Sequence, residues 1–190
     1  MAACRLSDGG RSLLSMTGTP LTGTSLETPF GTLTVLVTPE DGVVRSSGFR
    51  PMRDTLAALP SRLQARGWAE GPLPEVVDAI AAWLEGDGDA ITAVPVAQEG
   101  GPFFQEAWEQ LRTVPSGSAV SYQELATMAG RPRAMRAVGT ACARNNIAPF
   151  VPCHRVIQSG GRLGSYGFGG NEVKAAMLAL EGAWPPAAAS

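Results

Sequence analysis

The sequence predicts an α/β protein with two parts, a small α/β N-terminal domain with a short antiparallel sheet and a mainly helical C-terminal domain with a helix-turn-helix. Its 190 residues, 44% of them hydrophobic, suffice for one large domain or two small ones. The first half combines a hairpin signal with one helical stretch, whereas the second half reads as successive helices separated by Gly and Pro. We expect a tail over 1–24, domains over 25–96 and 97–184, and a tail over 185–190.

The first half contains one clear hairpin and two helical segments. In TLTVLVTPEDGVVRSSGF (32–49), two apolar runs flank Asp41-Gly42, a dipeptide typical of hairpin turns. A helix is expected over 53–66, and the periodicity over 74–85 predicts another. The buried face of the second helix is expected to comprise Val77, Ile80, Ala81 and Leu84. Residues 1–24, rich in Gly, Ser and Thr, are expected to be mobile.

The second half predicts four helices. A first helix is marked by Phe104, Ala107, Trp108 and Leu111. Ser121 and Glu124 have the spacing of a capping box, which opens a helix that Gly130 ends. Its buried face is expected to comprise Tyr122, Leu125, Ala126 and Ala129. Pro132 suits the first turn of a helix over 132–144.

The last helix is expected after the glycine-rich segment. Asn171 can cap its N-terminus, and Gly182 can end it. Its buried face is expected to comprise Val173, Ala176, Met177 and Leu180.

The two short helices on either side of Gly130 are typical of a helix-turn-helix, because a tight turn joins them and the second one is basic. Apart from its arginines, the second helix is mostly small, with Ala134, Ala137 and Gly139 among its residues. Small residues allow close backbone approach, which suits the minor groove better than the major groove. An ordinary core helix packed closely on its neighbour is the alternative.

The charge is unevenly distributed. The chain carries a net charge of −2, yet residues 97–190 hold eight basic and six acidic groups, whereas residues 1–96 hold seven and eleven. No Asp or Glu interrupts the six arginines Arg131, Arg133, Arg136, Arg144, Arg155 and Arg162. This cluster predicts a local electropositive surface for an anionic partner. A solvated surface rich in arginine explains the same pattern.

Several classes of protein do not fit the sequence. No apolar run reaches the roughly 18 residues that span a bilayer, and no signal peptide is evident, so a cytoplasmic protein without membrane contact is expected. Three cysteines make no disulfide framework. Without a CxxC motif or a second histidine, no zinc site is predicted.

The segment PFVPCHRVIQSGGRLGSYGFGG (149–170) places the sole histidine, His154, beside Cys153. Side chains of adjacent residues do not face each other in a strand or a helix, so a joint action needs a turn, a bridging water or a third group. Arg155 and Arg136 are candidates for lowering the thiol pKa. A buried, inert cysteine is the alternative.

The whole string is more specific than the Cys-His pair. VPCHRVI, preceded by Asn145 and followed by a glycine-rich loop with Tyr166, closely resembles the active-site signature of the O6-alkylguanine-DNA alkyltransferases, or methylated-DNA–protein-cysteine methyltransferases. The resemblance continues through SYQELATMAG and MRAVGTACARNN, covers about 100–182, and extends faintly to TPFGTLTV near the start. It implies a single, stoichiometric transfer of the alkyl group from O6-alkylguanine in double-stranded DNA to a cysteine of the protein, without a cofactor or metal.

The resemblance also implies roles for individual residues. Cys153 is the acceptor thiolate, His154 the base that relays the thiol proton through a water, and Glu181 the acid that orients His154. Asn145 braces the turn that carries the cysteine. Tyr122 assists the departure of guanine through its ring N3.

Further residues are expected to contact DNA or to line the guanine pocket. The family binds the minor groove as a monomer and flips the damaged nucleotide, and Arg136 resembles the arginine that fills the gap. The DNA contacts are expected from Arg136, Ala134, Ala137, Gly139, Arg144 and Arg155. The pocket is expected to comprise Tyr122, Val156, Tyr166 and Gly167, with Tyr166 in the lid.

One departure from the family pattern lies in this lid. From Tyr166 to Lys174 the chain is one residue longer than the pattern, and Gly167 replaces the usual small polar residue. The preferred alkyl size therefore stays open, as does clustering of the protein along DNA.

Three other functions compete with this interpretation. A cysteine hydrolase would need a distant histidine, and the chain has none. A non-enzymatic lesion binder would not need Cys153, and a transcription factor would not need the Cys-His motif. A mass measurement after incubation with alkylated DNA separates all of them.

Overall fold

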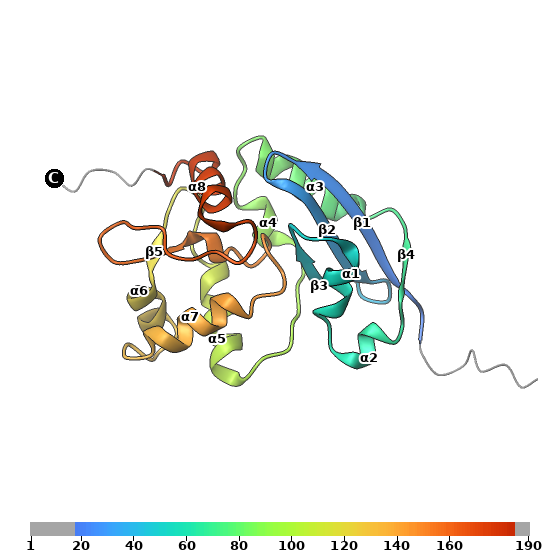
Figure 1. Cartoon of the computed structure of the whole chain (residues 1–190), viewed down its shortest axis with the longest axis horizontal. Coiled ribbons are helices and arrows are strands. Elements are labelled where there is room, and N and C mark those ends of the chain that lie inside the picture. The colour runs from blue at the N-terminus through green and yellow to red at the C-terminus, as the bar shows by residue number, and fades with distance from the viewer. Residues whose placement is uncertain (1–17, 185–190) are drawn as a thin grey trace, which may run out of the picture.

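The computed structural model describes residues 18–184. A four-stranded sheet occupies one side of the molecule (Figure 1). Its strands are β1 (Leu21–Thr28), β2 (Gly31–Thr38), β3 (Val43–Gly48) and β4 (Trp68–Glu70), in the order β3-β2-β1-β4. The first three strands pair antiparallel, and β4 pairs parallel to β1. The predicted hairpin is confirmed, with Gly42 at φ +68° in the turn between β2 and β3.

Strand β1 corrects the expected N-terminal tail. It begins at Leu21, so the last four residues of the predicted tail 1–24 lie in the sheet, while residues 1–17 lie outside the described part. The segment LTGTSLET offers little hydrophobic signal, because only its two leucines are apolar side chains. Pairing with the apolar strand β2 stabilises this segment as a strand, although its own sequence has little hydrophobic character.

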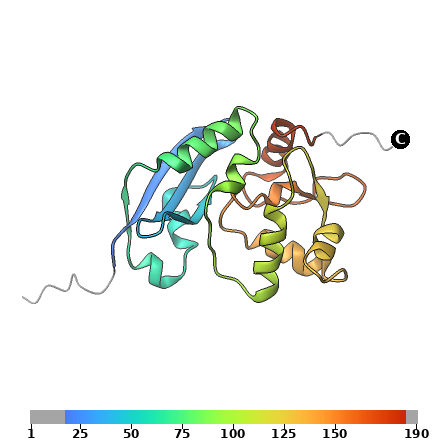
Figure 2. The same ribbon diagram turned by 180° about the vertical axis from the view of Figure 1, so that it is seen from behind.

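Helices cover both faces of the sheet (Figures 1 and 2). Helices α1 (Met52–Ala57) and α2 (Ser61–Gln64) pack on the face that carries Leu21 and Leu36. These two helices replace the single helix predicted over 53–66, because Pro60 lies between them and ends the first.

The predicted helix is present as α3 (Pro74–Leu84) and covers the opposite face, but of its predicted buried residues only Ile80 is buried. Val76, Ile80 and Trp83 are buried, whereas Val77 is 36% exposed. Both stripes have helical spacing, and the one that buries the large indole faces the core.

The second half is mainly helical (Figure 1). Its elements are α4 (Ala90–Ala93), α5 (Pro102–Arg112), β5 (Val120–Ser121), α6 (Tyr122–Met128), α7 (Met135–Ala143), a 3-10 turn (Cys153–Arg155), β6 (Val156–Ile157) and α8 (Gly170–Leu180). β5 and β6 form a short parallel pair. In α5 the predicted Ala107, Trp108 and Leu111 are buried, whereas Phe104 is half-buried.

The capping box of α6 is confirmed. The Ser121 hydroxyl accepts from the Glu124 amide at 3.1 Å, and the Glu124 carboxylate accepts from the Ser121 amide at 2.6 Å. Within α6, Leu125 and Ala126 are buried as predicted, and Tyr122 is half-buried. Gly130 follows the helix at φ +69°.

Two predicted helix starts are wrong. Helix α7 begins at Met135, because Pro132 lies in a turn between α6 and α7. Helix α8 begins at Gly170 after Gly169, which has φ +96°, so Asn171 is inside the first turn and makes no cap. In α8 Met177 is buried as predicted, but Ala176 is exposed.

One hydrophobic cluster runs through both halves of the molecule. It joins β2, β3 and α3 to the helices of the second half. Backbone bonds add to it, with Ser47 donating to Asn146 O at 2.8 Å and Ala97 to Val44 O at 3.0 Å. The domain boundary near residue 96 stays a prediction. Within residues 18–184, no helix has the length and apolar character needed to cross a membrane.

Candidate active site

Cys153 lies in a buried turn between α7 and β6. Pro152 precedes the turn, and all residues from 147 to 157 are buried. Cys153 is 5% exposed and His154 is fully buried. The predicted need for a turn at the Cys-His pair is met by the 3-10 geometry over Cys153–Arg155.

The side chain of Asn145 holds this turn. Its Nδ2 donates to Val151 O at 2.8 Å and to Cys153 Sγ at 3.2 Å. Its Oδ1 accepts from the Ile147 amide at 3.0 Å. One buried amide therefore ties the end of α7 to the sulfur atom, and it does so by donating a hydrogen bond to the sulfur.

The side chain of Asn145 is itself held by Gln98, a residue that the sequence did not indicate. Its Nε2 donates to Asn145 Oδ1 at 3.1 Å, and its Oε1 accepts from the Asn146 amide at 2.8 Å. Gln98 lies in the irregular segment between α4 and α5, where no periodicity marks a residue as important. This contact fixes which end of the Asn145 amide faces the sulfur.

His154 contacts Glu181 at the end of α8. His154 Nε2 lies 3.0 Å from Glu181 Oε1, and both side chains are fully buried. His154 Nδ1 is also buried and has no hydrogen-bond partner among the described residues. The structure therefore brings Cys153, Asn145, His154 and Glu181 together, as the resemblance implies.

Arg155 corrects a sequence prediction. It is fully buried and cannot contact DNA. Its Nε donates to Glu181 Oε2 at 2.9 Å, and its Nη1 and Nη2 donate to Val114 O and Gly88 O at 2.6 Å each. Burial of a guanidinium requires such partners, and Glu181 supplies the charge.

Trp83 of α3 completes the surroundings of Glu181. Its Nε1 donates to Glu181 Oε1 at 2.9 Å, and its ring centroid lies 6.2 Å from that of His154. Burial opposes ionisation of Glu181, but hydrogen bonds and charges from His154 and Arg155 lower its pKa to about 2. Glu181 is therefore a carboxylate at neutral pH.

The pKa of the Cys153 thiol is raised, because burial disfavours the thiolate. The bond from Asn145 and the positive charge of Lys174 act in the opposite direction. Neither Arg155 nor Arg136, the two candidates for lowering this pKa, contributes to it, and the cation that does is Lys174. Burial likewise lowers the pKa of His154, while Glu181 raises it.

Lys174 is the second residue that sequence reasoning missed. It is fully buried, and its Nζ donates to Val156 O and Leu163 O at 2.6 Å each. These bonds fasten α8 to the backbone on both sides of Gln158. A lysine in an amphipathic helix is normally exposed to solvent, so the sequence did not indicate that Lys174 is buried.

Two tyrosines are associated with the glycine-rich loop, Tyr122 in contact with it and Tyr166 within it. Tyr122 is half-buried at the start of α6, and a Cβ built at Gly164 would lie 3.4 Å from its hydroxyl oxygen. Tyr166 is 9% exposed, and its hydroxyl lies 3.5 Å from Met177 Sδ. Val156 is buried behind this loop and Gly167 is exposed on it.

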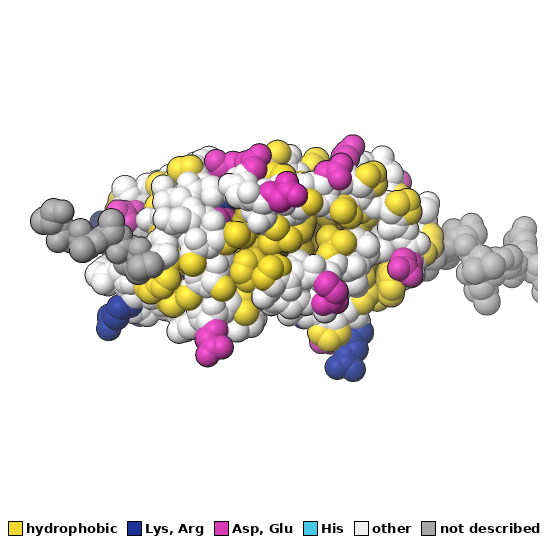
Figure 3. All heavy atoms as spheres, turned by 90° about the horizontal axis from the view of Figure 1, so that it is seen from above, with side chains coloured by type: hydrophobic (Ala, Val, Ile, Leu, Met, Phe, Trp, Pro, Cys, Tyr) yellow, Lys and Arg dark blue, Asp and Glu magenta, His cyan; other side chains and the backbone are white. Residues whose placement is uncertain are grey.

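Helix α7 carries the remaining predicted DNA contacts. Arg136 and Arg144 are exposed, while Ala134, Ala137 and Gly139 are half-buried. Arg144 lies over the Phe104 ring at 5.7 Å. The face that Figure 3 shows from above is not basic. Asp and Glu side chains are spread over it, and Lys and Arg side chains appear only near its edge.

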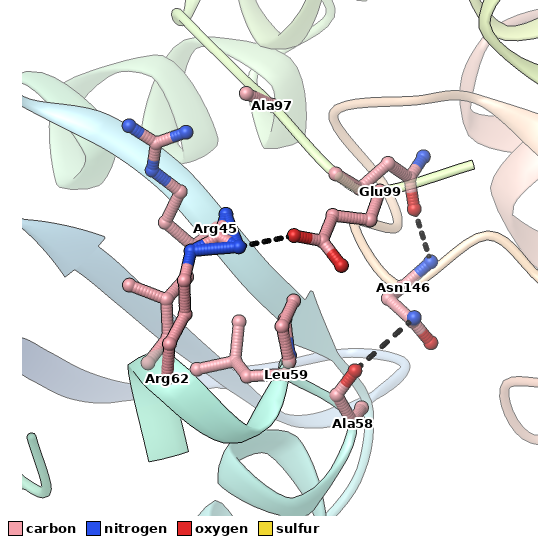
Figure 4. Close-up of a pocket in the computed structure, with 10 residues that line it drawn as sticks. Arg45, Ala58, Leu59, Arg62, Ala97, Glu99 and Asn146 are labelled. Carbon is pink, nitrogen blue, oxygen red and sulfur yellow. Dashed lines mark hydrogen bonds and ion pairs between the residues drawn. The ribbon is translucent and has the colours of Figure 1, made fainter. Parts of the chain in front are cut away.

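A groove of about 420 Å³ lies apart from Cys153, between the N-terminal helices and the segment before α5 (Figure 4). Arg62 and Glu99 form an ion pair across it. Gln98 and Asn146 are among its lining residues, and Gln98 also donates a hydrogen bond to Asn145. Neither Cys153 nor His154 lines it.

Comparisons with known proteins agree with this geometry. The family described as "6-O-methylguanine DNA methyltransferase, DNA binding domain" matches residues 102–183. A methylated-DNA–protein-cysteine methyltransferase of Mus musculus is 38% identical over 151 residues, which cover 74% of this chain and 71% of that protein. The constitutive enzyme of Bacillus subtilis is 35% identical over 159 residues, covering 83% and 93%.

A solved structure is also similar. The crystal structure of the Mycobacterium tuberculosis OGT in complex with DNA superposes with a TM-score of 0.66 and 32% identity, covering 84% of this chain and 92% of that one. Both sequence relatives align over more than two thirds of their own lengths. The chain therefore belongs to the family of methylated-DNA–protein-cysteine methyltransferases.

Proposed function

We propose that Cys153 is the residue that accepts the alkyl group in this protein's reaction, the direct transfer of an alkyl group from O6-alkylguanine in DNA to a cysteine of the protein. The observation that carries this assignment is the Cys153 sulfur, held at 3.2 Å by Asn145 Nδ2 within a turn that also carries His154. Cys142, the other described cysteine, lies in α7, where burial also raises its pKa but no side chain within residues 18–184 donates a hydrogen bond to its sulfur.

The proton of the thiol needs an acceptor, because burial raises the pKa of Cys153. His154 Nδ1 is the free nitrogen of the imidazole, since Nε2 faces Glu181. We assign Nδ1 as the acceptor, through a bridging water. Glu181 then stabilises the imidazolium, and Asn145 and Lys174 stabilise the thiolate.

The transfer forms a bond between Cys153 Sγ and the alkyl carbon and breaks the bond between that carbon and guanine O6. The electron pair passes into the guanine ring, and Tyr122 donates its phenolic proton to ring N3. A proton supplied in this way contributes roughly 10²–10⁴-fold to a rate. The thioether has no leaving group, so each molecule reacts once.

DNA binding is assigned to α6 and α7, acting as a helix-turn-helix in the minor groove. Arg136 is exposed on α7, whose small residues Ala137 and Gly139 allow a close approach of the backbone. The damaged nucleotide is flipped out of the duplex, and the Arg136 side chain fills the gap. Flipping is necessary because the reacting carbon sits on the edge of a base that is stacked and paired inside the duplex.

The test is intact-mass spectrometry after incubation with an oligonucleotide that contains O6-methylguanine. We expect one added methyl group, located by peptide mapping on Cys153, and no reaction in Cys153→Ser. Cys142→Ser is the matched control and should react like the wild type. A methyl group on any other residue, or several turnovers per molecule, would contradict the assignment.

A further inference from the structure

The loop between β6 and α8 contains a buried phenylalanine, Phe168. It lies in the stretch from Tyr166 to Lys174, which is one residue longer than the family pattern. It is only 8% exposed, although its neighbours Gly167 and Gly169 are exposed. A large apolar side chain buried in a glycine-rich loop contributes to holding that loop in place.

Phe168 is buried against the N-terminal sheet. A Cβ built on Gly48, the last residue of β3, would lie 2.5 and 2.7 Å from two carbon atoms of the Phe168 ring. Gly48 does not have a positive φ, so glycine is needed there for space and not for backbone conformation. The guanidinium of Arg50 lies over the same ring, 5.5 Å from its centroid.

Phe168 also contacts the predicted lid residue. The rings of Tyr166 and Phe168 lie 5.8 Å apart at 56°. Tyr166 reaches α8 through Met177 Sδ. The two aromatic side chains therefore connect α8 to the end of β3, and the segment before α8 passes beside the sheet in Figure 1.

The ends of this segment are glycines with positive φ. Gly164 has φ +71°, and Gly169 and Gly170 have φ +96° and +79°. Within residues 18–184, no side-chain hydrogen bond joins residues 164–170 to the N-terminal half. The packing of Phe168 on Gly48 and Arg50 is therefore an apolar link between this loop and the sheet.

We propose that Phe168 is a positioning residue, which docks the loop on Gly48 and so fixes Tyr166 at the alkylguanine pocket and limits the size of the alkyl group that is transferred. This inference rests on the proposed function. A loop held against the sheet by the Phe168 ring keeps Tyr166 in a fixed position. A loop released from the sheet can move outward and admit a larger group, such as benzyl, whereas methyl needs no extra space.

The experiment compares two variants that attack the contact from opposite sides. Phe168→Ala removes the ring, and Gly48→Ala adds a methyl group in the half that the proposal places outside the pocket. Gly101→Ala is the matched control, because a Cβ there meets nothing within 4 Å and its φ is −65°. Phe168→Leu keeps part of the contact and should give an intermediate result.

The measured quantity is the ratio of single-turnover rates for O6-benzylguanine and O6-methylguanine in the same oligonucleotide. We expect this ratio to rise about tenfold in Phe168→Ala and in Gly48→Ala, with the methyl rate within about threefold of the wild type. Hydrogen exchange of the amides of residues 164–170, measured without DNA, should accelerate in both variants.

An unchanged ratio in both variants overturns the proposal, whether or not exchange accelerates. An equal loss of rate on both substrates also overturns it, because Phe168 would then serve only folding. A wild-type protein that transfers neither group contradicts the proposed function instead, while the exchange measurement still tests the docking of the loop.

Discussion

Arg155 and Arg136 belong to the same acid-free stretch of sequence, yet the structure gives them opposite environments. Arg155 is fully buried and donates to Glu181 and to two backbone carbonyls. Arg136 is exposed on α7, and its side chain makes no hydrogen bond or ion pair within residues 18–184. The comparison indicates that the reactive turn is already organised in the absence of DNA. The arginine that we propose to contact DNA is instead exposed to solvent.

The largest expected effect separates the two arginines by stability. Arg155→Ala leaves the buried Glu181 carboxylate without its cation, so we expect the free energy of unfolding to fall by about 3–5 kcal/mol. Arg136→Ala should change it by no more than about 0.5 kcal/mol. Urea denaturation measures both. Similar losses in the two variants would mean that Arg136 has a structural role that its exposure does not reveal.

Glu181→Gln tests the other partner of Arg155. The pKa of Glu181 is lowered from 4.5 to about 2, so the carboxylate contributes stability that is fully present above about pH 5 and is lost as the pH falls toward 2. A shift of this size corresponds to on the order of 3 kcal/mol. The stability difference between wild type and variant should therefore shrink between pH 4.5 and pH 2 in acid titrations followed by circular dichroism.

The same variant should also change the chemistry of Cys153. Glu181 raises the pKa of His154, so its loss weakens the imidazolium and with it the thiolate. We expect a higher apparent thiol pKa, measured by the pH dependence of alkylation with a small haloacetamide, and slower alkyl transfer at nearly unchanged DNA affinity. Superimposable alkylation curves would remove Glu181 from the relay and leave Lys174 and Asn145 to activate the thiol.

Arg136→Ala should slow alkyl transfer from DNA while leaving the stability of the protein nearly unchanged. Unstacking a base costs a few kcal/mol, and the side chain offsets part of that cost only in a duplex. We expect transfer from double-stranded DNA to slow by roughly tenfold more than transfer from single-stranded DNA. Arg144→Ala is a suitable comparison, since that side chain already contacts the Phe104 ring. Equal losses on both substrates would point away from a role in base flipping.

The smallest expected effect concerns Gln98. Gln98→Glu keeps the acceptor for the Asn146 amide but removes the donor to Asn145 Oδ1. A lost buried hydrogen bond costs about 1 kcal/mol, so transfer should slow by about fivefold. Gln105→Ala, which removes a donor to Gln98 O on the other side, is the control. Wild-type rates in Gln98→Glu would show that Asn145 keeps its orientation without this contact.

The sequence predicted the parts of the fold that local signals determine. The Asp41-Gly42 hairpin and the capping box of Ser121 and Glu124 depend on neighbouring residues, and both are confirmed. Strand β1 was missed because its pairing with β2 is not visible in its own composition. The stripe on α3 was misplaced because two stripes had the same spacing, and only the packing of Trp83 selects between them.

The candidate site shows the same division. Cys153, His154, Asn145 and Glu181 came from a recognisable motif, and the structure brings them together. Arg155 was assigned to DNA because a local charge count does not distinguish a buried cation from an exposed one. Lys174 and Gln98 were missed because their partners are backbone carbonyls and a distant amide, which no sequence spacing encodes.

The position of Trp83 gives the protein an optical signal of its own. Its indole is fully buried, donates to Glu181 and lies 6.2 Å from the imidazole of His154. Protonation of the imidazole should quench the fluorescence of this indole. Comparison with Trp83→Phe separates the emission of Trp83 from that of the other three tryptophans, Trp68, Trp108 and Trp184. The emission of the unlabelled protein can thus follow protonation and alkylation at the neighbouring turn in real time, with no dye attached to the DNA.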